Sequence, residues 1–511
     1  MAQTRILALL SLQALTGCGY IPLYSYHNEE IKAQTLAVPQ PVQNVYRTLS
    51  LRPQLTGVQS GVDKASLLTV PWNITPSCRA KGIKTLPAAS ALKDCEDKNF
   101  VALTISGGGS RAAIFGAAVM FELQRYGLLD HVDLVSCVSG GCLTAAYYAL
   151  SCDNPDDQVS CPKTTNGAKR YAWTEAELYP LLERNLQWRW IGNWFWPNQI
   201  FKFWFTHFDR TDIMAETLSN NLFDRSILDN NQFRFRDLNP GRPNLAINAT
   251  DATASVETRF HFAFTPEKFQ EMRSDLDRYP IANAVMASAS FPGAFNYVTL
   301  RDFHAQRYVH LLDGGAYDNL GLNALRVAMR PSVDIPSGPE KRVVIIIDAF
   351  MALDTGLDKK AEVRSWSDYF IDSNFLVAYD TLLTSLRETQ LHLADTLLQK
   401  YQGTLLHISW DKLAEDPQHA WLANRLNRIP TSFNITPKNA ERLRQVADGD
   451  PGRDRRRTGR RSDLLLLPLR RRVRAPARLA RVGAVRAALD HDPALAAGRA
   501  LAGADRAVRL V

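Results

Sequence analysis

Ser139 lies in a segment with the residue types of a nucleophile elbow, Cys137-Val-Ser-Gly-Gly141. In such an elbow a strained turn lifts the serine oxygen clear of a sheet, and small neighbours such as Gly141 let a strand and a helix approach each other. The pattern Gly-x-Ser-x-Gly is met only in its second half, because Cys137 occupies the first glycine position. On this segment alone, a buried Ser-Gly-Gly turn is the better interpretation.

A glycine run precedes this serine by the length of one strand-helix-strand unit, in Ser106-Gly-Gly-Gly-Ser-Arg111. Glycines that open a helix expose backbone N–H groups at the positive end of the helix dipole, so they can hold an anion. In acyl transfer that anion is the tetrahedral oxyanion, and loss of one donor typically costs ~3 kcal/mol. A phosphate cradle is the competing interpretation, but the Lys-Ser/Thr of a Walker loop and the spacing Gly-x-Gly-x-x-Gly are both missing.

Asp313 ends an apolar run and is followed by two glycines, in Leu311-Leu-Asp-Gly-Gly315. A carboxylate that is held close to a hydroxyl and partly shielded from water can accept the serine proton during attack. An aspartate that only forms the turn before Gly314 is equally consistent with this segment.

In their order and spacing, the three segments resemble the patatin-like phospholipase family. In that family a glycine-rich oxyanion loop, a Gly-x-Ser-x-Gly elbow and an Asp-Gly-Gly motif assemble a Ser-Asp dyad. The resemblance runs from about Phe100 to Asp348, and it includes the segments Asn248–Asp251 and Ala287–Phe295. The sequence departs from the family at Ser106, where many members have Asp, and at Cys137, which could change how tightly the elbow packs.

The resemblance implies a role for each matching residue. Ser139 attacks, Asp313 is its base, and the oxyanion donors come from the glycine run. The expected donors are Gly107, Gly108 and Gly109, and the expected supporting residues are Arg111, Gly141, Gly314 and Gly315.

The implied activity is that of a serine lipid acyl hydrolase of the phospholipase A or lysophospholipase type, acting on phospholipids or lysophospholipids without cofactor or metal. Two alternatives remain: a hydrolase of soluble esters or thioesters on the same dyad, and a non-catalytic lipid-binding envelope lipoprotein. A dyad needs no histidine. The histidines that follow Asp313 lie on no recognisable catalytic loop: His392, His407, His419 and His491.

The elements that must position these residues read as an α/β fold. A strand-helix-strand-helix unit is expected within about 50 residues. Its parts are the apolar run Phe100–Ile105, the helical spacing of Arg111–Leu128, the strand-like Val132–Val135 and the apolar Leu143–Leu150. Such a unit predicts a three-layer fold, with a mostly parallel central sheet and helices on both faces. Further strand candidates are Asn244–Asn248, Phe260–Phe264, Tyr308–Leu312 and Arg342–Asp348, and the pattern from Ser365 to Tyr401 is helical.

The amino terminus is typical of an exported lipoprotein. A positive start at Arg5, a short apolar run from Ile6 to Leu15 and small residues before Cys18 are the marks of a signal peptide. Leu15-Thr-Gly-Cys18 also resembles the bacterial lipobox, whose cysteine is diacylated, although an ordinary secretory signal with a chance cysteine is a weaker alternative. We expect a lipid-anchored protein of the bacterial cell envelope, on the outer membrane or the periplasmic face.

The chain divides into five expected regions: a signal peptide (1–17), a lipid-anchored tether (18–95), the catalytic domain (96–350, with an insertion at about 152–240), a helical part of the same domain (351–446) and a tail (447–511). The tail carries sixteen arginines and no aromatic residue, as out-of-frame reading of GC-rich DNA would produce. It accounts for the net charge of +8, so we infer no nucleic-acid partner. A basic arm for anionic lipid is the less favoured interpretation of the tail.

The insertion contains an aromatic cluster. From Trp188 to Phe208 there are five Trp and five Phe residues in 21 positions, with Arg189, Lys202 and Arg210 as the cations in and beside them. Trp residues flanked by cations favour a bilayer interface or an acyl funnel, and an aromatic core under the sheet is about as consistent.

An exported protein permits disulfides. Short polar loops suggest the pairs Cys78–Cys95 and Cys152–Cys161. Metal ligation is the weaker alternative, because no Cys-x-x-Cys or His-x-x-x-His spacing accompanies the cysteines.

Overall fold

The computed structural model describes residues 99–448 with interruptions, together with the short segments 28–31, 52–54 and 68–70. The interruptions are 158–160, 162, 165–169, 226–232, 240, 255–259, 329–340, 351–373, 401–402 and 414–419. The expected signal peptide, Cys18, the suggested pair Cys78–Cys95 and the tail from residue 449 onward lie outside the described residues.

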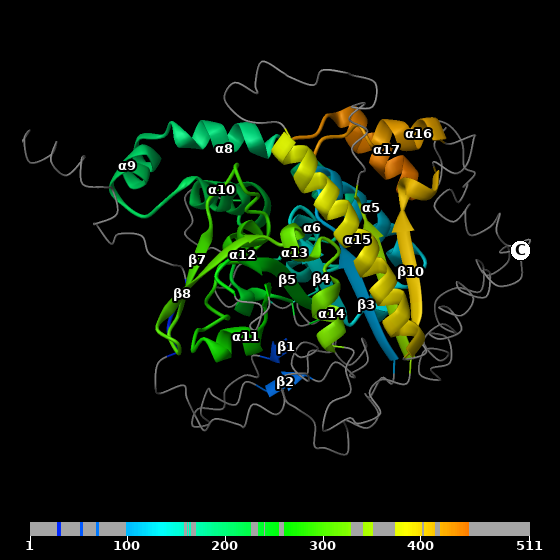
Figure 1. Cartoon of the computed structure of the whole chain (residues 1–511), viewed down its shortest axis with the longest axis horizontal. Helices are drawn as coiled ribbons and strands as arrows, with labels where there is room; N and C mark the ends of the chain where they lie inside the picture. Colours follow the sequence, from blue (N-terminus) through cyan, green and yellow to red (C-terminus); the bar gives the residue numbers. More distant parts are fainter. Residues whose placement is uncertain are drawn as a thin grey trace, which may run out of the picture.

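One eight-stranded sheet forms the centre of the molecule (Figure 1). Its strands follow the order β10-β9-β3-β4-β5-β8-β7, and β6 pairs with β5 beside this path. The strand bounds are β3 (Asn99–Ile105), β4 (Leu134–Val138), β5 (Asn244–Asp251), β6 (His261–Phe264), β7 (Val298–Asp302), β8 (Arg307–Asp313), β9 (Lys341–Asp348) and β10 (Thr404–Ser409). The run from β10 to β5 is parallel, whereas β6, β8 and β7 are antiparallel to their neighbours. The predicted mostly parallel sheet is therefore confirmed.

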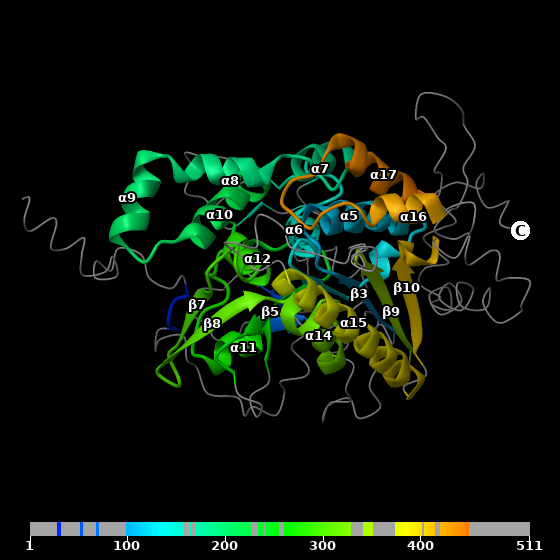
Figure 2. The same cartoon turned by 45° about the horizontal axis from the view of Figure 1, so that its top comes forward.

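Helices cover both faces of this sheet (Figure 2). The helices that matter for the site are α5 (Gly109–Arg125), α6 (Gly141–Leu150), α12 (Ile281–Ser288), α13 (Gly315–Asp318), α14 (Leu322–Ala328), α15 (Asn374–Lys400), α16 (Ala420–Leu426) and α17 (Pro437–Asp448). The insertion adds α7 (Glu175–Leu182), α8 (Leu186–Trp194), α9 (Pro197–Phe205) and α10 (Arg210–Leu218), and α11 (Pro266–Glu271) follows β6.

The alternation of side chains along the strands builds two separate cores. In β3, Val101 and Leu103 join the larger core with α5, α6, α12 and α17, while Phe100 and Ala102 join the smaller core under α14 and α15. Successive strand side chains point to opposite faces, so a strand that is apolar at every position must be covered twice. This is why the continuous apolar runs in the sequence correctly predicted a three-layer fold.

The short segment 28–31 packs on this domain. The Asn28 side chain donates to Ser274 Oγ at 3.0 Å and to the carbonyl of Arg301 at 2.8 Å, which ties a piece of the expected tether to the β7 side of the sheet. Strands β1 (Arg52–Gln54) and β2 (Leu68–Val70) pair with each other antiparallel.

The suggested disulfide Cys152–Cys161 is confirmed. Among the described residues, no helix combines the length and the apolar character needed to cross a bilayer.

The carboxyl-terminal helix α17 ends at Asp448, two residues later than the boundary expected for the tail. Val446 and Ala447 are buried in the larger core. The helix packs along α5, the helix that begins at the glycine run.

We therefore expect two truncations to behave differently. A chain ending after Ile435 loses α17 and exposes the apolar side of α5, so its free energy of unfolding should fall by roughly 3 kcal/mol or more. A chain ending after Asp450 keeps α17 and should unfold at the same urea concentration as the full chain. Equal urea midpoints for both truncations would show that α17 contributes nothing.

Candidate active site

Strand register brings Ser139 and Asp313 to one edge of the sheet. Val138, the last residue of β4, lies opposite Asn248 of β5, and the next residue of β5, Ala249, lies opposite Asp313. Ser139 follows Val138 directly, so the serine and the aspartate flank β5 at the same level. Residues separated by 174 positions in the sequence thus become neighbours.

The elbow at Ser139 is a strained turn between β4 and α6. Ser139 has a φ of 48°, in the left-handed region that side chains other than glycine rarely adopt. A side chain at Gly140 would overlap the backbone of Gly109, and one at Gly141 would meet the carbonyl of Ser106 at 2.5 Å. The two glycines therefore let α6 begin directly against the glycine run.

The hydroxyl of Ser139 donates to Asp313 Oδ2 at 2.9 Å. Asp313 Oδ1 accepts the N–H of Gly315 at 2.7 Å, so both carboxylate oxygens have a partner. Burial raises the pKa of Asp313 to about 6, although the hydrogen bonds from Gly315 and Ser139 act in the opposite direction. A carboxylate with this pKa is ionised at neutral pH and can still take a proton, as a general base must.

The glycine run lies beside the serine. A side chain at Gly107 would come within 3.3 Å of Ser139 Cβ, and Gly108 and Gly109 have φ values of 142° and 60°, which favour glycine. The N–H of Gly107 donates to the carbonyl of Asn319 at 3.1 Å, whereas the backbone hydrogen bonds of the described residues leave the N–H groups of Gly108 and Gly109 free. Of the three expected oxyanion donors, Gly108 and Gly109 are therefore the available ones.

Two helices begin at this point. The N-terminus of α5 is at Gly109 and that of α6 is at Gly141, and the two helices pack against each other. Each helix presents the positive end of its dipole, so both favour negative charge that develops near Ser139.

Arg111 holds the first turn of α5 in place. Its buried guanidinium donates to the carbonyl of Ala349 at 3.1 Å, to the carbonyl of Ile429 at 2.6 Å and to Thr431 Oγ1 at 3.1 Å. The supporting position expected for Arg111 thus connects the glycine run to the end of β9 and to the segment before α17. Position 314 also requires glycine, because a side chain there would overlap the carbonyl of Asn248.

Ser288 and Asn248 hold the elbow through hydrogen bonds to its backbone, and neither was assigned a role from the sequence. Ser288 Oγ accepts the N–H of Ser139 at 2.8 Å and donates to the carbonyl of Asn248. Asn248 Nδ2 donates to the carbonyl of Cys137 at 2.8 Å. Both lie in segments that the family resemblance had included, which was the only signal in the sequence.

A disulfide that was not predicted joins Cys137 to Cys142 across the elbow. Both side chains are fully buried, and the bridge links β4 to the first turn of α6. Only the sharp turn at Ser139 brings the two Cα atoms to 4.9 Å. Cys137, which occupies the first glycine position of the pattern, is thus part of a disulfide that closes the segment containing Ser139.

No histidine in the described part of the chain bonds to the side chain of Ser139 or Asp313. His407 Nε2 pairs with the buried Asp348 at 2.9 Å, and His310 Nδ1 lies 2.9 Å from Thr299 Oγ1. Within the same residues, no group of three or more His, Cys, Asp or Glu side chains is arranged to hold a metal ion.

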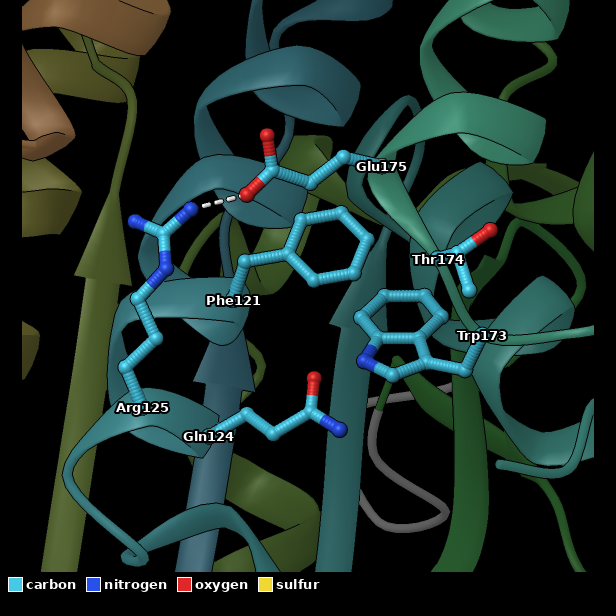
Figure 3. A pocket seen from close by; sticks show the side chains of 6 residues that line it. All are labelled: Phe121, Gln124, Arg125, Trp173, Thr174 and Glu175. Atoms are coloured by element: carbon cyan, nitrogen blue, oxygen red, sulfur yellow. Dashed lines mark hydrogen bonds and ion pairs between the residues drawn. The ribbon is translucent and has the colours of Figure 1, made fainter. Parts of the chain in front are cut away.

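A surface pocket of about 250 Å³ lies at the other end of α5 (Figure 3). Phe121 and Trp173 form its apolar wall, and an ion pair between Arg125 and Glu175 borders it. At about 1.5 Å per residue, the length of α5 separates this pocket from the glycine run, so it is not part of the site at Ser139.

Comparison with known proteins agrees with the motifs. The patatin-like phospholipase family model matches residues 103–326, which include the glycine run, the elbow and Asp313. This match confirms the resemblance to the family that was inferred from the sequence. The comparison with curated proteins gave no match.

Solved structures show more distant similarity. Human GIVD cytosolic phospholipase A2 in complex with methyl gamma-linolenyl fluorophosphonate is 14% identical with a TM-score of 0.35, over 73% of this chain and 60% of that chain. VipD from Legionella pneumophila is 14% identical with a TM-score of 0.23, over 51% of this chain and 52% of that chain. This chain therefore spans between about half and three fifths of the length of these structures.

The pKa of Asp313 predicts a pH profile for the reactivity of Ser139. We expect the rate of labelling by a fluorophosphonate probe to rise with pH, with its midpoint at about 6, because only the ionised carboxylate accepts the serine proton. The folded protein holds this proton more tightly than the unfolded chain, so this group's contribution to stability falls as pH rises from about 4 to about 6. Asp313→Asn should abolish the pH step in labelling; a step that persists in this variant would assign it to another group.

Ser288 is expected to act as a positioning residue. Ser288→Ala leaves the N–H of Ser139 without its acceptor, so kcat for an activated ester should fall by roughly tenfold while KM stays the same. Ser288→Thr keeps the hydroxyl and should recover most of the turnover. A change in KM with kcat unaltered would contradict the positioning role.

Proposed function

We propose that this protein is a serine hydrolase that removes acyl chains from lipids, of the phospholipase A or lysophospholipase type. The observation that carries the proposal is the 2.9 Å hydrogen bond from Ser139 Oγ to Asp313 Oδ2, beside a glycine run in which the N–H groups of Gly108 and Gly109 have no partner among the described residues. The family model matched by the surrounding residues is that of phospholipases, which supports a lipid ester as the substrate.

Attack begins at the hydroxyl of Ser139. As its oxygen bonds to the ester carbonyl carbon, its proton passes to Asp313 Oδ2, and the carbonyl oxygen takes up the negative charge. The free N–H groups of Gly108 and Gly109 and the N-terminus of α5 are the donors available to this charge.

Collapse of the tetrahedral intermediate breaks the ester C–O bond. The leaving alkoxide takes the proton from Asp313 and departs as an alcohol, which leaves the acyl chain on Ser139. Water then attacks this acyl-serine while Asp313 accepts its proton. Asp313 returns the proton to Ser139 as the fatty acid leaves, so no histidine is needed at any step.

We further propose that the protein acts at the cell envelope, anchored through an acylated Cys18. This part rests on the lipobox-like Leu15-Thr-Gly-Cys18 and lies outside the described residues. The disulfides Cys137–Cys142 and Cys152–Cys161 support an oxidising compartment such as the periplasm.

The proposal is tested with a defined phospholipid and a soluble short-chain ester. Ser139→Ala and Asp313→Asn should each lower hydrolysis of both substrates by a factor of about a thousand or more, because nucleophile and base act as a unit. Both variants should remain folded, which an unchanged far-UV circular dichroism spectrum would show. His407→Gln serves as the control, since His407 contacts Asp348 rather than the dyad, and its turnover should remain.

Three outcomes would contradict the proposal. Loss of turnover on replacing a histidine, without unfolding, would indicate a triad. Hydrolysis of short-chain esters with no activity on phospholipid would favour the soluble-ester hydrolase. Failure of the parent chain to hydrolyse either ester or to react with a fluorophosphonate would favour a non-catalytic lipid-binding protein.

A further inference from the structure

Helix α9 is built with its polar side inward. Gln199 is buried, and its side-chain amide donates to Glu216 of α10, which also pairs with Lys202 at 3.1 Å. The neighbouring positions Phe201 and Trp204 face solvent and are 57% and 58% exposed. In an ordinary surface helix the apolar side is buried and the polar side is wet, so α9 has the reverse arrangement.

The exposed apolar side chains form one continuous stretch of sequence. We call residues 188–205, which comprise most of α8, all of α9 and their connection, the aromatic arm. Its apolar side chains that are between 38% and 72% exposed are Trp188, Phe195, Trp196, Ile200, Phe201, Phe203 and Trp204. In both views α9 lies farther out than the edge strand β7, so the arm projects from the body of the molecule (Figures 1 and 2). A group of exposed large apolar side chains like this one marks an interaction site on a protein surface.

The charge of the arm indicates the chemistry of its partner. From Trp188 to Phe208 there is no Asp or Glu, and the charged residues are Arg189, which is exposed, and Lys202. Trp residues with flanking cations are typical of segments that lie in the headgroup region of a bilayer. Helices α8 and α9 have nine residues each, which is far shorter than the length needed to span the hydrocarbon. Such short helices can lie in the interface but cannot cross it.

Packing contacts lead from the root of the arm to the glycine run. The Trp190 ring lies 4.9 Å from that of Phe295, which lies 6.1 Å from that of Phe433. The carbonyl of Phe433 accepts the N–H of Gln187 at 3.1 Å. The residue before Phe433, Ser432, accepts the N–H of Ser110 at 2.8 Å and packs on Gly109. A series of ring contacts and backbone hydrogen bonds therefore connects the exposed arm with the neighbourhood of Ser139.

We propose that the aromatic arm is the surface by which this protein docks on anionic phospholipid bilayers, lying in the headgroup region and presenting lipid to Ser139. The presenting role rests on the proposed lipid hydrolase activity, whereas docking itself does not. Docking removes the exposed aromatic surface from water, and the absence of carboxylates avoids repulsion by anionic headgroups.

The first experiment measures binding. Full-length chains that all carry Cys18→Ser, so that no lipid anchor contributes, are sedimented with phosphatidylcholine vesicles with and without phosphatidylglycerol. The triple variant Trp196→Ala, Phe201→Ala, Trp204→Ala should bind vesicles with an affinity lower by roughly tenfold or more. Trp421→Ala is the matched control, because Trp421 is 47% exposed on α16 and lies away from the arm, and its affinity should not change. Equal affinities for the parent chain and the triple variant would overturn the proposal.

A second measurement locates the arm in the bilayer. Fluorescence of the parent chain should be quenched by vesicles of brominated phospholipid, and the variant Trp196→Phe, Trp204→Phe should lose most of that quenching. Self-association of the parent chain that the triple variant abolishes, without vesicle binding, would mean that the arm contacts a second copy and would also overturn the proposal.

Measuring hydrolysis distinguishes a failure of the docking proposal from a failure of the proposed hydrolase function. Ser139→Ala should bind vesicles like the parent chain, and the triple variant should retain turnover of the soluble ester but lose most turnover on vesicles. If the parent chain docks without any Ser139-dependent hydrolysis, docking stands and the proposed function fails. If the triple variant hydrolyses vesicles as fast as the parent chain, the arm does not present lipid.

Discussion

The hydrogen bond between Ser139 and Asp313 is the contact around which the site is organised, because it requires the carboxyl ends of β4 and β8 to lie at the same level on either side of β5. It forms only if β4 and β8 both pair with β5 in the observed register, and a shift of one residue would turn each strand's side chains to the other face. Because β8 runs antiparallel to β5, its last residue, Asp313, lies at the carboxyl end of β4. The change of strand direction is therefore part of the site.

The surroundings of this bond stabilise two features that would be unfavourable alone, a strained backbone and a buried carboxyl group. Ser139 has a left-handed backbone, and Asp313 is a carboxyl group removed from water. Ser288 accepts the N–H of Ser139, Gly315 donates to Asp313, and the disulfide Cys137–Cys142 closes the elbow covalently. Residues whose conformation the neighbours over-determine can keep strain at a reactive position. In this protein a disulfide stands where the family pattern has a glycine, so covalent closure accompanies small side chains in shaping the turn.

The surroundings of Ser139 and the aromatic arm differ in which side chains they bury. The dyad residues Ser139 and Asp313 are buried and bonded to each other, whereas along α9 large apolar side chains are exposed and Gln199 is buried. The first arrangement favours chemistry that needs a shielded base. The second favours contact with an apolar phase, and the aromatic contacts of Trp190, Phe295 and Phe433 connect the two. A water-insoluble ester as substrate would account for both features.

Much of the architecture could be read from the sequence, because its signals are local. Continuous apolar runs predicted the buried parallel strands, and β3, β5 and β9 lie close to their predicted limits. The edge strand β7 and strand β10 were not predicted, since β7 carries charged residues and the side chains of β10 are mostly half-buried. The catalytic candidates were also visible, because glycine runs and an Asp-Gly-Gly turn are local necessities of backbone shape.

What only the tertiary structure decided is which distant groups meet. The sequence by itself determined that Ser139, Asp313 and the glycine run were candidates. It did not distinguish Gly107, whose N–H bonds to Asn319, from Gly108 and Gly109, whose N–H groups have no partner in the described part of the chain. Nor did it show Ser288 beneath the elbow or decide between an aromatic core and an exposed arm at residues 188–205. Hydrogen-bond partners and burial are properties of packing between elements far apart in the chain, and a local pattern carries no information on which of its polar groups packing will occupy.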